Sequence, residues 1–130
     1  MINILIKSES RYPISRQSIK ETVERVLTER RAKGKIEISI NIAGDRLMRS
    51  INKKYRELDE STDVLSFPFA EMKKDSFFVD PPDGILRLGE IIISYPKAVE
   101  EAGEEEKMVD QKVAELVEHG LLHLLGYHHE

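Results

Sequence analysis

The sequence contains no cysteine and no long run of apolar residues. Without cysteine there can be neither a disulfide framework nor a thiolate metal site, so a bound metal would need His, Asp, Glu or backbone ligands. No apolar run approaches the roughly 20 residues that a membrane-spanning helix needs. The short apolar run at 2–6 lacks the preceding basic segment and the following cleavage pattern of a signal peptide. We therefore predict a cytoplasmic protein that has no membrane partner.

The length of 130 residues suits one compact domain over residues 1–130. The net charge of −4 argues against a protein that coats nucleic acid through a general positive field. Yet residues 1–56 hold 14 Lys and Arg against 6 Asp and Glu, whereas residues 57–130 hold 6 against 18. The basic half, at +8, is either a set of solvated helix faces or a phosphate-binding face.

Hydrophobic periodicity predicts the element order β-α-β-α-β-β-α-α. The predicted strands are 2–6, 35–42, 62–69 and 88–94, and the predicted helices are 15–32, 45–55, a short one after Pro96, and 107–125. Asp45 is expected to cap the second helix, with Leu47, Met48 and Ile51 facing inward. The stretch 71–87 is expected to be a long loop. This order predicts an α+β domain with a mixed sheet of about four strands packed with helices.

All four histidines lie in the last twelve residues, HGLLHLLGYHHE. His119 and His123 are four apart on a predicted helix, so they lie one turn apart on the same face and can chelate one ion. Gly126 is placed to break the helix and turn the chain, which would bring His129 towards the same point. Three imidazoles with a fourth position left to water are typical of catalytic zinc. We predict one Zn²⁺ per chain on a zincin-like helix.

The spacing H-x-x-x-H-x-x-G-x-x-H is that of the metzincin peptidases. In those enzymes the residue after the first histidine is the glutamate that acts as general base, whereas this chain has Gly120. A metzincin-like metallopeptidase is therefore the alternative among enzymes, without its usual base. The histidines could instead be ordinary helix-face residues or a cloning tag, but a tag would be a homopolymeric run.

HGLLHLLGY followed by His129 closely resembles the signature of the YbeY family, bacterial endoribonucleases that act as rRNA maturation factors. YRELDESTDVLSFPF at 55–69 and LGEIIIS at 88–94 resemble the second and third blocks of that family. The resemblance implies a zinc-dependent, single-strand-directed endoribonuclease. Its substrate would be ribosomal RNA, especially the 3′ end of 16S rRNA, and ribosomal particles would be partners in ribosome quality control.

Carried over to this sequence, the family's zinc ligands fall on His119, His123 and His129, and its functionally important arginine falls on Arg56. The family usually has Asp before the third histidine, where this chain has His128, which we interpret as a residue at the surface or behind the ligands. It could also be a competing ligand or a proton carrier. Arg56 would stabilise charge on the scissile phosphate, because a guanidinium offers a fork to phosphate oxygens. A zinc-binding ribosome-assembly factor without turnover is the alternative outside enzymes.

Overall fold

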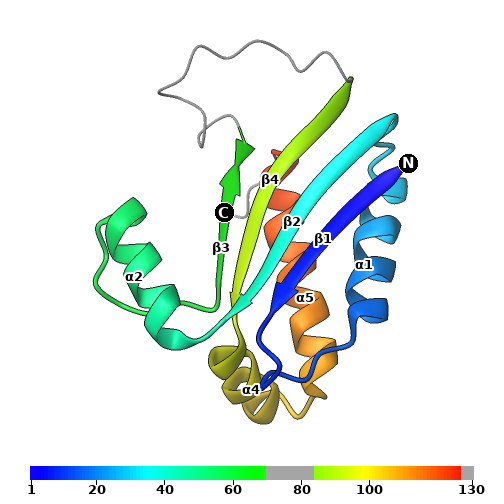
Figure 1. Cartoon of the computed structure of the whole chain (residues 1–130). Coiled ribbons are helices and arrows are strands. Elements are labelled where there is room, and N and C mark those ends of the chain that lie inside the picture. The colour runs from blue at the N-terminus through cyan, green and yellow to red at the C-terminus, as the bar shows by residue number, and fades with distance from the viewer. Residues whose placement is uncertain (70–83, 127–130) are drawn as a thin grey trace.

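The computed structural model describes residues 1–69 and 84–126 (Figure 1). In chain order its elements are β1 (Ile2–Ser8), α1 (Arg16–Glu29), β2 (Lys35–Ala43), α2 (Asp45–Arg56), β3 (Val64–Pro68), β4 (Ile85–Ser94), α4 (Tyr95–Glu104) and α5 (Val109–Leu124). This is the order that the hydrophobic pattern predicts. The predicted loop at 71–87 falls mostly outside the described residues, and its last three residues, 85–87, belong to β4 instead.

The strands form a four-stranded sheet in the order β1-β2-β4-β3. β1, β2 and β4 run parallel, and β3 runs antiparallel to β4. Isoleucines occupy alternate positions of β2 and are buried, because successive side chains of a strand point to opposite faces. The mixed sheet confirms the predicted α+β class.

α1 and α5 lie on the same face of the sheet and enclose the main core (Figure 1). Ser15 begins α1, since its side-chain oxygen accepts a hydrogen bond from the backbone N–H of Ser18 at 3.1 Å. The buried side chains that the two helices contribute are Ile19, Val23, Val26, Leu27, Val113, Leu116, Val117 and Leu121. Each such side chain stabilises the fold by about 1.5–3 kcal/mol relative to an exposed one. This packing fixes which face of α5 points away from the sheet.

α2 packs on the opposite face, at the β3–β4 side of the sheet (Figure 1). Ile92 of β4 belongs to the cluster under α2, whereas its neighbour Ile91 belongs to the core under α1 and α5. Met48 is fully buried in the α2 cluster. Leu47, which the sequence pattern places inward, is 47% exposed, so that prediction is wrong. Met48 and Ile51, which the same pattern also places inward, do pack into this cluster.

The start of α2 also differs from the prediction. Its N-cap is Gly44, and Asp45 is the first helical residue rather than the cap. The Asp45 carboxylate accepts hydrogen bonds from the hydroxyls of Ser61 and Ser94, both at 2.9 Å. Ser94 is buried, and its oxygen also accepts from the backbone N–H of Lys97 to cap α4. These contacts join the start of α2, the loop before β3 and the end of β4.

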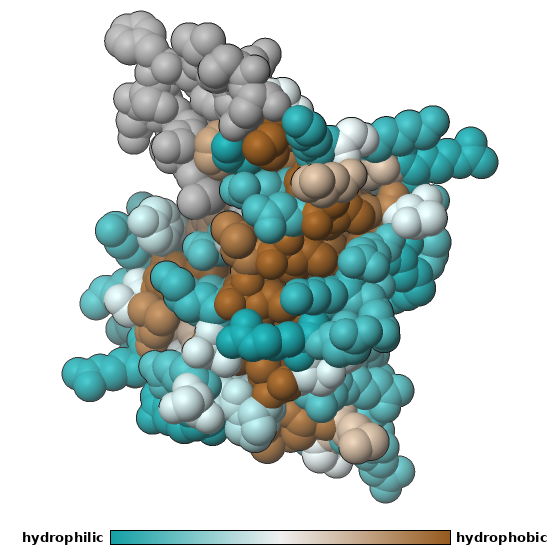
Figure 2. Space-filling view, turned by 45° about the vertical axis from the view of Figure 1, so that its right-hand side comes forward, coloured by the Kyte–Doolittle hydropathy of each residue, from teal (hydrophilic) through white to brown (hydrophobic). Residues whose placement is uncertain are grey.

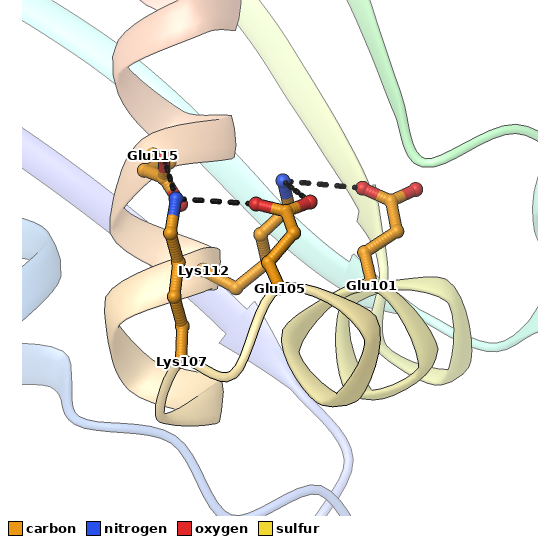
Figure 3. Close-up of polar contacts among 5 residues, drawn as sticks. All are labelled: Glu101, Glu105, Lys107, Lys112 and Glu115. Atoms are coloured by element: carbon orange, nitrogen blue, oxygen red, sulfur yellow. Dashed lines mark hydrogen bonds and ion pairs between the residues drawn. The ribbon is translucent and has the colours of Figure 1, made fainter.

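The acidic run of α4 and of the turn after it pairs with Lys107, in the turn before α5, and with Lys112 of α5 (Figure 3). Lys107 Nζ lies 2.6 Å from Glu115 Oε1 and 3.1 Å from Glu105 Oε1. Lys112 Nζ lies 2.8 Å from Glu105 Oε2 and 3.4 Å from Glu101 Oε1. Hydrogen bonds from the two lysines lower the pKa of Glu105, while burial raises the pKa of Glu101. The network attaches the first half of α5 to α4 and so orients the helix.

Figure 2 shows a band of hydrophobic side chains on the surface, flanked by hydrophilic ones. Two strand residues, Leu5 and Leu86, are 48% and 54% exposed. Across residues 1–69 and 84–126, no helix is both long enough and apolar enough to cross a membrane.

Candidate metal centre and substrate face

α5 presents the first two predicted zinc ligands. Val117 and Leu121 on its inner face are fully buried, while His119 is exposed and His123 is half-buried. The two imidazole rings stack, with centroids 5.4 Å apart and planes 23° apart. The structure thus brings together the pair that the spacing of four predicts.

α5 ends where the sequence predicts a turn. Leu124 is its last helical residue, and Leu125 is the C-cap. Gly126 has φ +92°, a conformation that glycine adopts readily because it has no Cβ. Its N–H donates to the carbonyl oxygen of His123 at 3.0 Å. The chain therefore leaves the helical path directly after the two histidines.

His128 and His129 lie outside the described residues, so the third ligand stays a prediction. Within 1–69 and 84–126 there is no group of three His, Cys, Asp or Glu side chains that could hold a metal ion. His119 and His123 supply two imidazoles from one helix face, which are donors that Zn²⁺ prefers at a spacing that zinc sites use. The described half of the site therefore fits zinc, and His129 would complete the three-histidine set.

Gly120, between the two histidines in sequence, faces the core. The residue is buried, and a Cβ here would lie 2.9 Å from Cγ2 of Ile91 and 3.2 Å from two further carbons of that side chain. Such an approach is too close for carbon atoms in van der Waals contact. The glycine allows α5 to lie close to β4. A glutamate at this position, which carries the general base in metzincins, would clash with Ile91.

Arg56 is the last residue of α2 and reaches over to β3. Its Nη2 donates to the carbonyl oxygen of Ser66 at 3.1 Å, and its guanidinium carbon lies 4.8 Å from the centre of the Phe67 ring. β3 is an edge strand, and α5 packs against both β3 and β4. Arg56 is therefore held on the edge strand β3 from the α2 side of the sheet, whereas α5 covers the other face of that strand (Figure 1).

Asn52 and Glu57 fix the turn that follows α2. Asn52 is 2% exposed, and its Nδ2 donates to the carbonyl oxygen of Glu60 at 3.0 Å. Glu57 adopts a left-handed conformation with φ +60°, and its N–H donates to the carbonyl oxygen of Asn52. The sequence motifs single out neither Asn52 nor Phe67, although Phe67 stands inside the block at 55–69. Both side chains act through contacts across the loop, for which the sequence gives no local signal.

The comparisons with known proteins identify the family. A family model described as "Endoribonuclease YbeY" matches residues 4–130. The chain belongs to the YbeY family. Its resemblance to that family, suggested by the blocks at 55–69 and 88–94 and by the histidine cluster, is confirmed.

Several curated proteins named endoribonuclease YbeY are similar to this chain. The protein of Dehalococcoides mccartyi strain CBDB1 is 42% identical over 135 residues, which cover 99% of this chain and 81% of the relative. The protein of Roseiflexus sp. strain RS-1 is 44% identical over 112 residues, which cover 86% of this chain and 69% of the relative. The solution structure of TM1509 from Thermotoga maritima matches with a TM-score of 0.59 at 26% identity, covering 100% of this chain and 75% of that one. The fold is thus shared with a solved protein.

Proposed function

We propose that this chain is a zinc-dependent endoribonuclease that cleaves single-stranded RNA. Membership of the YbeY family supports the reaction class, because its curated relatives are named endoribonucleases. The observation that carries the metal dependence is the stacked pair of imidazoles, 5.4 Å apart, on the outer face of α5. Gly120 disfavours the peptidase alternative, since a glutamate cannot be placed there without displacing Ile91.

His119, His123 and His129 would hold the ion in this proposal. When bound, Zn²⁺ acidifies water and polarises a phosphoryl oxygen, which is the chemistry that phosphodiester hydrolysis needs. The buried inner face of α5 fixes the helix, so the first two imidazoles stay one turn apart on its outer face.

Arg56 would bind a phosphate oxygen and stabilise the negative charge that develops during cleavage. A guanidinium offers a planar fork of N–H donors that matches phosphate oxygens. The Ser66 carbonyl and the Phe67 ring hold the side chain in place, so its orientation does not depend on the substrate. A positioned charge of this kind is worth more than one that must be ordered in the transition state.

We further propose that the substrate is ribosomal RNA, with the 3′ end of 16S rRNA as the preferred region. Ribosomal particles would be the partners, and ribosome quality control in the cytoplasm would be part of the same role. These points rest on the family resemblance of the three sequence blocks, and the cysteine-free composition suits a reducing compartment.

The first prediction concerns the metal. The wild-type chain should bind about one Zn²⁺, and His123→Ala should lose most of it together with RNA cleavage, because two imidazoles hold zinc far more weakly than three. Metal analysis of the purified proteins, paired with cleavage assays on single-stranded RNA and on casein, measures both properties.

Neighbouring histidines provide the control. His129→Ala should lose zinc, and His128→Ala should keep it. If His123→Ala keeps full zinc, the site is wrong. A wild-type protein that cuts casein but not RNA would favour the metallopeptidase, and one that binds zinc and RNA without cutting either substrate would favour the assembly factor.

A further inference from the structure

We propose that Tyr55 is a stacking platform for one unstacked nucleobase of single-stranded RNA, beside the phosphate that Arg56 binds. The inference rests on the proposed endoribonuclease function and adds to it a recognition element for single strands. It starts from an exposed aromatic residue. Tyr55, in the last turn of α2, is 56% exposed, although burying an aromatic ring is among the largest apolar contributions to stability.

Tyr55 is exposed but has a defined position. Its ring packs edge-on against Phe67, with centroids 5.3 Å apart and planes 62° apart. Phe67 is only 8% exposed and belongs to the buried cluster with Met48 and Ile92. The tyrosine therefore rests on a fixed core residue, so a ligand that stacks on it would pay little ordering cost.

Each ring of this pair has a cation over it. Lys54 Nζ lies 5.2 Å from the centre of the Tyr55 ring, and the Arg56 guanidinium carbon lies 4.8 Å from the centre of the Phe67 ring. The two rings thus contact each other, and each contacts one cation. Lys53 adds a third positive charge to the same helical turn. A phosphate backbone can pair with these cations while a base lies on the tyrosine.

The acidic residues that follow α2 do not cancel this charge entirely. Asp59 pairs with Arg49 at 2.8 Å, and that contact lowers the pKa of the Asp59 carboxyl. The last turn of α2 itself contains Lys53, Lys54 and Arg56 and no acidic residue. The local field therefore favours an anionic ligand rather than an apolar peptide.

Basic side chains interleaved with an exposed aromatic ring suit single-stranded nucleic acid. Bases in a duplex are stacked on each other and cannot offer a face, whereas an unpaired base can stack on tyrosine whatever its identity. The platform lies next to Arg56, which contacts the edge strand β3. The base on Tyr55 would accordingly belong to a nucleotide that adjoins the phosphate bound by Arg56.

The test is a binding titration with a short, labelled 2′-O-methyl RNA oligonucleotide. The oligonucleotide is checked for cleavage after each titration. Tyr55→Ala in the full-length zinc-loaded protein should bind the single strand about tenfold more weakly, because one base–aromatic stack is worth roughly that factor. Tyr55→Phe should bind nearly as well as wild type, since it keeps the ring. Affinity for the same sequence as a duplex should not change.

A matched control is Leu47→Ala, which truncates another exposed apolar residue of α2 that is 47% exposed. It should leave single-strand affinity unchanged. If Tyr55→Ala does not fold, Tyr55→Leu keeps the apolar volume without the ring and should show the same loss. Oligonucleotides with one abasic position provide a second readout. When the missing base is the one that stacks on Tyr55, the affinity of wild type should fall about tenfold. The affinity of Tyr55→Ala should not fall further, because this variant has already lost the stack.

Four results would overturn the proposed role of Tyr55. The first two are that Tyr55→Ala binds the single strand with wild-type affinity, or that it loses as much affinity for the duplex as for the single strand. The other two are that Tyr55→Phe loses as much affinity as Tyr55→Ala, or that the effects of the abasic position and of Tyr55→Ala add. Failure of the proposed function gives a different result, because wild type itself would then neither bind nor cut single-stranded RNA. If wild type cuts RNA and Tyr55→Ala cuts and binds it equally well, only the platform is lost.

Discussion

α1 and α2 are both rich in basic residues, but they use them differently. On α1, Arg25 lies 2.9 Å from Glu29 and also pairs with Glu118 of α5. Hydrogen bonds from Arg25 to Glu118 and Glu29 raise the pKa of the arginine. At the end of α2, Lys54 and Arg56 lie over aromatic rings. A cation paired with two acids contributes little to the outward field, whereas an aromatic ring carries no net charge that would offset the cation over it.

The same contrast exists within α2. Arg49, in the first half of the helix, pairs with Asp59 at 2.8 Å, as Arg25 does with its acids. Only the last turn combines positive charge with exposed aromatic surface among these two helices. The number of lysines and arginines in residues 1–56 therefore does not locate an RNA-binding face. The partner of each cation is the better guide.

Of the changes on α1 and α2, the one at Arg56 is expected to have the largest effect. Arg56→Ala should fold and keep its zinc but cleave single-stranded RNA about 10²–10³-fold more slowly, the scale observed when one charge-stabilising donor is removed from an active site. Arg56→Lys should recover only part of the rate, because a point charge cannot reproduce the guanidinium fork. Single-turnover cleavage with metal analysis of the same samples measures this.

Arg25→Ala is the matched arginine on α1, and its cleavage rate should stay at the wild-type level because its charge is committed to Glu29 and Glu118. A wild-type rate for Arg56→Ala would return Arg56 to the class of surface residues. A slow rate for Arg25→Ala would mean that the substrate also crosses α1.

A smaller effect is expected in the salt dependence of RNA binding. Neutralising the α2 pair, with Lys53→Gln and Lys54→Gln together, should reduce the slope of log affinity against log salt by about one for each lysine that contacts a phosphate. Neutralising Arg25 and Arg30 on the α1 side should leave the slope nearly unchanged. Binding titrations at several salt concentrations measure both slopes, and a flatter slope from the α1 pair would move the RNA to that helix.

Features with a local period could be predicted from the sequence. β2 alternates isoleucines with polar residues, and the structure buries the isoleucines as a strand pattern requires. His119 and His123 share a helix face because they are four residues apart, and Gly126 turns the chain because it adopts φ +92° at little cost. In each case a short stretch of sequence carries both the cause and the result.

Features that join distant segments could not be predicted in this way. The residues around Asp45 in the sequence predict that it caps a helix. Its carboxylate instead accepts a hydrogen bond from the hydroxyl of Ser94, 49 residues further along the chain. From the sequence, Gly120 stands where a metzincin has its catalytic base. In the structure, the close approach of α5 to Ile91 explains why this residue is a glycine. The contact of Arg56 with Phe67 likewise depends on how β3 lies beside α2. Periodicity tells which face a residue occupies, but not which partner it meets there.

The smallest effect is expected for the stability of the fold when the α1 pairing is removed. Arg25 and Glu118 are 51% and 38% exposed at their side chains, so water and salt screen the attraction between them. Arg25→Ala should lower the free energy of unfolding by no more than about 1 kcal/mol, the usual upper range for exposed ion pairs. The loss should shrink in high salt. Denaturant unfolding of Arg25→Ala, Glu118→Ala and the double variant isolates the pair, because their non-additivity measures the coupling. A coupling free energy well above this range, and insensitive to salt, would mean that the Arg25–Glu118 pair stabilises the packing of α1 on α5. The cations of α1 would then serve the fold and not RNA binding.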